Sequence, residues 1–132
     1  MASLKNIAVV GDRDVDPTEE LHRAFDKMME EILPNNRYSI LKTSINRGAS
    51  HVVYDHKSEN FTKAISDYPP NWDKYGKQAG AFVYLFFAST CDIGVTIGSI
   101  HSKDNRALIQ IFREKHVPVY NLDVATLKWS KL

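Results

Sequence analysis

The chain has 132 residues, of which 43% are hydrophobic, so it can bury one core but is too short for two ordinary domains. Seventeen basic and sixteen acidic residues leave a formal net charge of +1, without the block of positive charge typical of a duplex-DNA binder. We therefore expect a single domain over residues 1–132 and no nucleic-acid partner.

Cysteine content and apolar patterning predict where the protein resides. The only cysteine, Cys91, excludes an intramolecular disulfide and a cysteine-rich zinc site. Residues 1–5 lack the features of a signal peptide, and the longest apolar stretch, residues 79–88, is far shorter than the ~20 residues that cross a bilayer. We expect a cytoplasmic protein with no membrane partner.

The first third of the chain predicts a strand, a helix and a second strand. Residues 6–10 form an apolar run that stops at Gly11, as in a strand buried on both faces. Asp16 as N-cap and Pro17 at the first helical position predict a helix that ends near Pro34. Residues 38–43 predict the second strand. One face of the helix carries Leu21, Ala24, Phe25, Met28, Met29 and Ile32.

The middle of the chain has weaker signals. Gly48 permits a turn into a helix over residues 49–59, which contains poor helix formers. Residues 61–66 predict a short third strand, and the prolines in residues 69–71 require a loop. Residues 77–89 predict an unusually apolar helix, which should be nearly buried or face a second subunit.

The last third predicts two more strands around one helix. Residues 92–97 form an apolar run before Gly98, and Ser102 can cap the helix that follows. Residues 117–122 predict the last strand, and residues 125–132 form a tail without an assigned role. Alternating strands and helices favour a Rossmann-like, three-layer α/β fold in which helices flank a mainly parallel sheet.

Three glycine-containing turns fall at the predicted carboxyl edge of this sheet, where such folds bind ligands. They are residues 11–14, 46–50 and 98–102. In the first, free helix amides and Arg13 could hold a phosphate; in the third, Ser99 and Ser102 could do so. Each turn could equally be a plain strand-to-helix connection, with Ser102 serving only as a cap.

Other side chains bear on the chemistry of the site. Trp72 follows the proline turn and could stack on a base, whereas Trp129 should pack locally in the tail. The histidines show no recognised metal-ligand spacing, so we expect no metal. Asp55 and His56 could perform acid–base chemistry, but the more common role of such residues is on a solvated helix face.

Three segments together resemble the SLOG superfamily of Rossmann-like nucleotide-binding domains, and within it the small YspA-like (YpsA-related) branch of bacteria and phages. Residues 9–14 resemble its strand followed by Gly-Ser-Arg-Asp, and residues 47–50 resemble a reduced form of its Gly-Gly-Ala-x-Gly-Ala-Asp turn. Residues 68–80 are similar to its Phe-Pro-Ala-Asp-Trp and Tyr-Gly-Lys-x-Ala-Gly stretches. The resemblance implies a nucleotide ligand and adds Asn71 and Lys77 to the candidate site.

Two departures from the family pattern bear on catalysis. Residues 81–84 read Ala-Phe-Val-Tyr where the family usually has an Arg-Asn pair, and Gly98 alone remains of its Pro-Gly-Gly-x-Gly-Thr loop. In the related lonely-guy phosphohydrolases, which release a base from a nucleoside monophosphate, this loop leads to a catalytic glutamate. No glutamate lies between Gly98 and Ile111. The resemblance therefore favours binding over base release.

The main hypothesis is a homodimeric module that binds a nucleotide or a nucleotide-derived ligand, either ADP-ribose-like or a cyclic nucleotide. Such a module could sequester a signalling nucleotide. We expect it to use no cofactor and no metal. One alternative is a hydrolase that cleaves an N-glycosidic or phosphate bond with Asp12, Asp14 or Asp55. Another is a ligand-free module that inhibits a host enzyme in the host cytoplasm. The candidate ligand-binding residues are Gly11, Asp12, Arg13, Gly48, Ala49, Ser50, Asn71, Trp72, Lys77, Gly98, Ser99 and Ser102.

Overall fold

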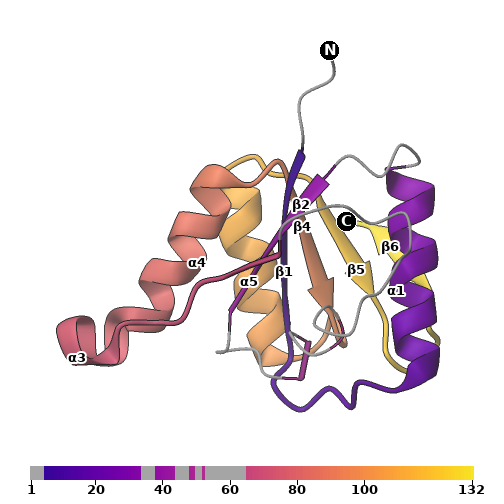
Figure 1. Ribbon diagram of the computed structural model, residues 1–132, viewed down its shortest axis with the longest axis horizontal. Coiled ribbons are helices and arrows are strands. Elements are labelled where there is room, and N and C mark those ends of the chain that lie inside the picture. Colours follow the sequence, from indigo (N-terminus) through magenta and orange to yellow (C-terminus); the bar gives the residue numbers. More distant parts are fainter. Residues whose placement is uncertain (1–4, 34–37, 44–47, 50–51, 53–64) are drawn as a thin grey trace.

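A six-stranded sheet forms the centre of the computed structural model, which describes residues 5–33, 38–43, 48–49, 52 and 65–132 (Figure 1). The strand order is β3-β2-β1-β4-β5-β6, and every neighbouring pair is parallel except β5 with β6. The strands are β1 (Lys5–Gly11), β2 (Tyr38–Lys42), β3 (Ile65–Asp67), β4 (Ile93–Ile97), β5 (Val119–Leu122) and β6 (Trp129–Lys131).

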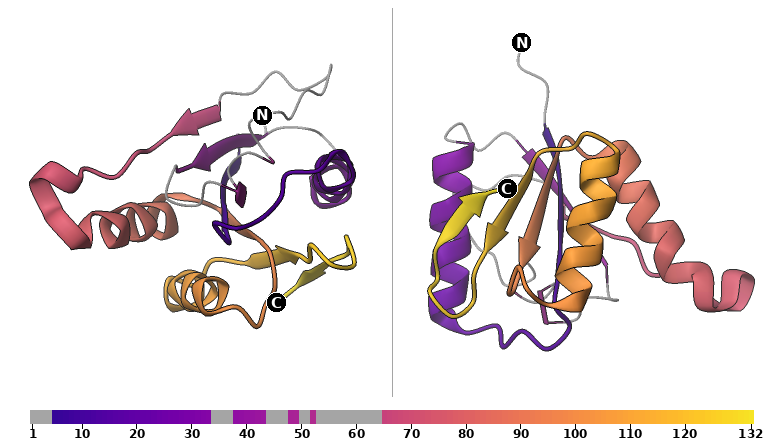
Figure 2. Two further views of the ribbon diagram at one scale, coloured as in Figure 1. Left: turned by 90° about the horizontal axis from the view of Figure 1, so that it is seen from below. Right: turned by 180° about the vertical axis from the view of Figure 1, so that it is seen from behind.

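Helices cover both faces of the sheet, as Figures 1 and 2 show: α1 (Glu19–Ile32) lies on one face, and α4 (Ala79–Thr90) and α5 (Lys103–Glu114) lie on the other. Alternate residues of β1 enter different cores, because successive strand side chains point to opposite faces. Val9 joins the core under α1, whereas Val10 joins the core under α4 and α5. The predicted three-layer, Rossmann-like α/β fold is confirmed.

The centre of the sheet is also the point at which the chain reverses its direction of winding. From β1 the chain runs outward through β2 to β3, then returns through α4 to place β4 on the other side of β1. Folds of this kind bind ligands beyond the carboxyl ends of the two strands at such a reversal. The carboxyl ends of β1 and β4, paired at Gly11 and Ile97, therefore define where a site is expected.

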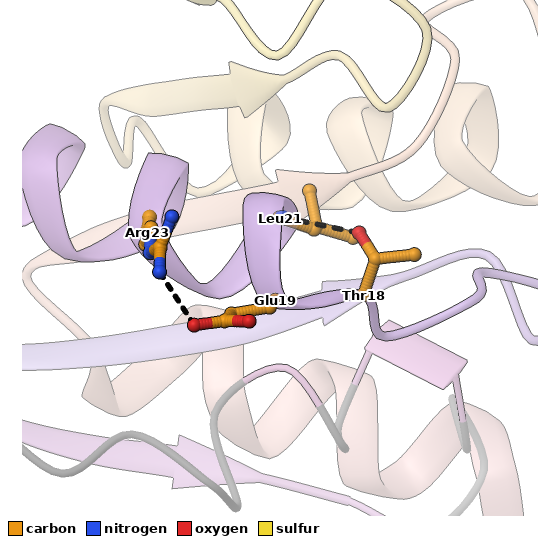
Figure 3. A network of polar contacts seen from close by, with 4 residues as sticks. All are labelled: Thr18, Glu19, Leu21 and Arg23. Carbon is orange, nitrogen blue, oxygen red and sulfur yellow. Dashed lines mark hydrogen bonds and ion pairs between the residues drawn. The ribbon is translucent and has the colours of Figure 1, made fainter.

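Helix α1 begins two residues later than its proline suggests. Its N-cap is Thr18, whose Oγ1 accepts a hydrogen bond from the Leu21 amide at 3.2 Å (Figure 3). The prediction of Asp16 as N-cap and Pro17 as first helical residue is therefore wrong. Threonine and aspartate side chains can both accept a hydrogen bond from a free amide at the start of a helix. The sequence therefore offers two possible N-caps, Asp16 and Thr18, and the structure uses Thr18.

The described part of the middle region corrects one boundary. Gly48, Ala49 and Val52 are helical, but residues 53–64, which contain most of the predicted second helix and the start of the predicted third strand, lie outside the described residues. Strand β3 occupies Ile65–Asp67. The proline loop is confirmed, and a short helix, α3 (Trp72–Tyr75), and a 3₁₀ turn, η2 (Gly76–Gln78), lead from it into α4.

Helix α4 is only partly buried, so the first of its two predicted alternatives is wrong and the second, that it faces a second subunit, stays a prediction. Ala79, Gly80, Phe87 and Ala88 are its buried residues. The helix has 12 residues. Among the residues that the structure describes, no helix has the length and apolar character needed to cross a membrane.

The C-terminal tail adds an unexpected sixth strand. Strand β6 pairs antiparallel with β5, so the prediction that residues 117–122 form the last strand is wrong. The prediction that Trp129 packs only locally is also wrong. Its ring contacts Tyr120 with centroids 5.7 Å apart, and its Nε1 donates to the carboxylate of Glu31 on α1 at 2.7 Å.

We expect Thr18→Ala to lower the free energy of unfolding by about 1 kcal/mol, because the Leu21 amide loses its acceptor. Urea denaturation monitored by circular dichroism measures this loss. Arg23→Ala is the matched control on the same helix: it breaks only the exposed ion pair with Glu19, worth about 0.5 kcal/mol or less. Equal losses in the two variants would contradict the capping role.

Candidate functional site at the carboxyl ends of strands β1 and β4

Two glycines let the carboxyl ends of β1 and β4 approach each other closely. Gly11 has φ +154°, and a Cβ there would collide with the carbonyl oxygen of Ile97. Gly98 has φ +140°, and a Cβ there would collide with the carboxylate of Asp12. Both residues were predicted to belong to the site, and the structure brings them together at the chain reversal.

The Asp12 carboxylate joins these two strand ends. Its Oδ1 accepts a hydrogen bond from the Ser102 hydroxyl at 2.7 Å, and its Oδ2 accepts one from the Ser99 amide at 3.3 Å. The Asp12 amide donates to the Ile97 carbonyl at 3.1 Å. Ser102 is also the N-cap of α5, as predicted, since its Oγ accepts from the Asn105 amide. An acidic side chain of the protein thus occupies the positive end of α5, where Rossmann-like folds often bind phosphate.

Buried amides fix the loop between β4 and α5. Asn105 is fully buried, and its Nδ2 donates to the Ser99 carbonyl at 3.0 Å. Asn121 on β5 donates to the Gly98 carbonyl at 3.3 Å and accepts from the Thr96 hydroxyl at 2.8 Å. Because these groups are buried and hydrogen bonded, the loop is held in one conformation before any ligand arrives.

A polar hollow of about 310 Å³ opens beside this loop. Its wall contains three carboxylates and two cations, so it suits a ligand group that is rich in hydroxyls better than it suits a bare anion. The hollow is lined by Asp12, Arg13, Asp14, Val15, Ser102, Lys103, Asp104 and Val124.

A second hollow of about 310 Å³ lies between α4 and α5 and has a different character. Trp72 and Tyr84 contribute aromatic rings, and 54% of the surface of Trp72 is exposed. Most of the remaining wall is aliphatic, as in sites that bind planar groups. The lining residues are Arg13, Trp72, Lys77, Gly80, Ala81, Tyr84, Asp104, Ala107, Leu108 and Ile111.

Arg13 lines both hollows, and so does Asp104. The arginine comes directly after β1 and Asp12, which places a permanently charged guanidinium at the boundary between the polar and the aromatic space. Lys77 lies in the aromatic hollow and Lys103 in the polar one. The structure therefore brings together Asp12, Arg13 and Ser102 from two predicted turns with Trp72 and Lys77 from the proline segment.

The second predicted turn supports the first. Gly48 donates its amide to the Arg13 carbonyl at 3.0 Å, and Ala49 donates to the Asp12 carbonyl at 3.3 Å. A Cβ at Gly48 would collide with the carbonyl oxygen of Val15, so only glycine allows this approach. Neither residue lines the two hollows, and Ser50 lies outside the described residues. Ligand contact by this turn stays a prediction.

Gly98, Ser99 and Asn71 occupy structural positions near the site. Ser99 donates to the Asp12 side chain and Gly98 leaves the space that this side chain occupies, and neither residue lines the two hollows. Asn71 caps α3, with its Oδ1 accepting from the Lys74 amide at 3.0 Å, and it faces a separate apolar hollow along α4. Their contact with a ligand also stays a prediction.

Other reactive groups fall outside this site. Burial raises the pKa of the Cys91 thiol to about 12, so at neutral pH it stays protonated and is a poor nucleophile. Within the residues that the structure describes, no cluster of three or more His, Cys, Asp or Glu side chains could hold a metal ion. Asp55 and His56 lie outside the described residues.

Comparisons of the chain with protein-family models, with curated proteins and with solved structures found no match.

Several residues that line the two hollows were not predicted from the sequence, among them Tyr84, Lys103 and Asp104. In the sequence, Tyr84 belongs to residues 81–84, which depart from the family's Arg-Asn pair and were not predicted to contact a ligand. It lies four residues after Gly80, on the same side of α4, and the small side chain of Ala81 leaves room before it. Small residues followed one helical turn later by an aromatic residue were the feature of the sequence that could have predicted this hollow.

We expect Gly98→Ala to lower the free energy of unfolding by roughly 2–5 kcal/mol, because the new Cβ adds a clash with Asp12 to the strain of a positive φ. Gly76→Ala is the control. Gly76 also has positive φ, +57°, but its Cβ would meet nothing within 4 Å, so only the strain of about 1–3 kcal/mol applies. Chemical denaturation compares the two, and a larger loss for Gly76→Ala would refute the close packing at Gly98.

Proposed function

We propose that this chain is a divergent SLOG-like module that binds a nucleotide-derived ligand of the ADP-ribose type across the two hollows. The main support for this proposal is that Arg13 lines both the polar and the aromatic hollow. The ligand's base would stack in the hollow of Trp72 and Tyr84, its diphosphate would meet Arg13, and its distal sugar would enter the polar hollow.

The chemistry of the walls supports this order of groups. Stacking on an aromatic ring suits any base. Arg13 and Lys77 supply charge for phosphate at the boundary, whereas Asp12 and Asp14 can accept hydrogen bonds from sugar hydroxyls. A phosphate in the polar hollow would meet three carboxylates, which argues against a simple mononucleotide phosphate in that position.

The same contacts favour binding over catalysis. The Asp12 carboxylate is already hydrogen bonded to Ser102 and Ser99, which leaves it less free to act as a base or nucleophile. Asp14 is the remaining described candidate for the hydrolase alternative. Conversion of the ligand during incubation, abolished by Asp14→Asn, would establish the hydrolase.

We expect calorimetry to show that ADP-ribose binds more tightly than AMP or ribose 5-phosphate. Trp72→Ala should weaken ADP-ribose and AMP by about 1–3 kcal/mol through lost stacking and leave ribose 5-phosphate unchanged. Arg13→Ala should weaken all three by about 1.5–3 kcal/mol, because each contains phosphate.

Arg23→Ala is the matched control, since Arg23 is an exposed arginine on α1 that lines neither hollow. Binding that is equally reduced by Arg23→Ala would reflect general electrostatics. Absence of binding for all three compounds, with a folded protein, would reject the nucleotide proposal and favour the ligand-free interaction module.

We further propose that the protein forms a homodimer through the outer face of α3 and α4. This face exposes Tyr75, Phe82, Leu85 and Phe86, each 41–45% exposed, and residues 79–90 contain no charged side chain. A charged partner surface would leave charges unpaired against α4, whereas a second copy presents the same uncharged α4 surface in a two-fold arrangement. On α3, the Nζ atom of Lys74 lies 5.1 Å from the centroid of the Tyr75 ring. Such apolar patches commonly mark interfaces.

We expect sedimentation velocity to show a dimer that Phe82→Glu and Phe86→Glu convert to a monomer, because each places a charge in the proposed interface. Leu127→Glu is the control, since Leu127 is a similarly exposed apolar residue, 37% exposed, in the β5–β6 connection. A monomeric wild-type protein, or a dimer insensitive to both phenylalanine substitutions, would disprove this interface.

A further inference from the structure

A third hollow, of about 670 Å³, lies along α5 and does not include Arg13. It begins at His101 next to the N-terminus of α5 and continues along the helix to Arg113, with Leu132 after β6 on the opposite side. Figure 1 shows α5 on the face of the sheet away from α1. We call this hollow the α5 groove; it is lined by Ile100, His101, Lys103, Arg106, Ala107, Ile109, Gln110, Arg113 and Leu132.

The charge of the α5 groove is of one sign, although the whole chain is nearly neutral. The lining contains the basic side chains of Lys103, Arg106 and Arg113 and no aspartate or glutamate. No residue in the described part of the chain forms an ion pair with these three cations. Their charges are thus available to a partner, and together they create a local positive field.

The spacing of the cations matches an elongated partner. Lys103, Arg106 and Arg113 lie on one side of α5, and with the helical rise the first and last are about 15 Å apart. A single phosphate or carboxylate group cannot contact all three. A second helix with acidic residues at intervals of three and four presents its charges with the same spacing and can lie alongside α5.

The apolar part of the lining distinguishes between two kinds of polyanion. Ile100 and Leu132 are exposed, at 38% and 37%, and with Ala107 they supply aliphatic surface beside the cations. Single-stranded nucleic acid binds through bases stacked on aromatic rings, and the groove lining contains no aromatic ring other than His101. Aliphatic surface suits the apolar stripe of an amphipathic helix.

We propose that the α5 groove docks an acidic amphipathic helix of a protein partner, with Lys103, Arg106 and Arg113 pairing with its carboxylates and with Ile100 and Leu132 contacting its apolar side chains. This surface borders the proposed nucleotide site, since it shares Ala107 with the aromatic hollow and Lys103 with the polar hollow, whereas Arg106 and Arg113 line the groove and neither hollow. It gives the protein a second function: recruitment of an acidic helical segment.

The test uses a fluorescent helical peptide of roughly 14 residues with glutamates on one face and leucines beside them, long enough to cover the groove. Fluorescence anisotropy with the full chain should show saturable binding that a peptide with lysine in place of glutamate lacks. Arg106→Glu combined with Arg113→Glu should weaken binding about tenfold or more, because attraction becomes repulsion at two of the three cations of the groove. Neither arginine lines the nucleotide hollows.

The matched control is Lys27→Glu combined with Lys128→Glu, which changes the net charge equally at exposed positions on α1 and before β6. Peptide binding should survive this change. Equal weakening by both double variants would overturn the proposal, as would tighter binding of an oligothymidine of similar length than of the acidic peptide. Amide chemical shifts that change at Ile100, Gln110 and Leu132 on peptide addition would support the groove, and changes confined to α3 and α4 would refute it.

Discussion

The hydrogen bonds of the Asp12 carboxylate hold the centre of this molecule together. They join the end of β1 to the start of α5, between residues that lie 90 positions apart in the sequence. The carboxylate also compensates the amides at the N-terminus of α5, which would otherwise need water or a ligand. Gly98 is required by this contact, since a Cβ there would collide with the Asp12 carboxylate, and Gly11 and Gly48 avoid collisions with the nearby backbone of Ile97 and Val15.

This internal anion explains why the proposed site differs from a typical phosphate cradle. In many Rossmann-like folds the helix amides and a glycine loop bind the phosphate directly. Here the amide of Ser99 is already engaged, so charge for a ligand must come from side chains such as Arg13 and Lys77. Side-chain cations on a solvent-exposed edge are screened by salt, and binding that depends on them should vary with ionic strength.

The layers of the fold and the members of the site were predictable from sequence to different degrees. The apolar run before Gly11 and the helical spacing from Leu21 to Met29 report local periodicity, and both elements are confirmed. Strand β6 and the contact of Trp129 with Glu31 depend on residues far apart in the chain, and no local pattern encodes them. Asp12 was predicted as a site residue because it follows the glycine turn after β1. Its hydrogen bond with Ser102 could not be predicted, because it depends on β1 and β4 being neighbours in the sheet. Gly48 was predicted to contact a ligand, which stays a prediction; its packing role could not be read from the sequence, because the Val15 carbonyl with which a Cβ would collide is brought to it by the fold.

The position of β1 at the centre of the sheet has a consequence for how the chain acquires its structure during synthesis. Strand β1 precedes β2 and β4 in the chain and can pair with β2 early, but its other edge stays unpaired until β4 is made, because Ile7 pairs with Ile93. Until then an apolar strand edge remains open, and such edges recruit strands from other molecules. Folding of this small domain should therefore be slow for its length, and chaperones that shield nascent strands would act mainly before β4 is complete.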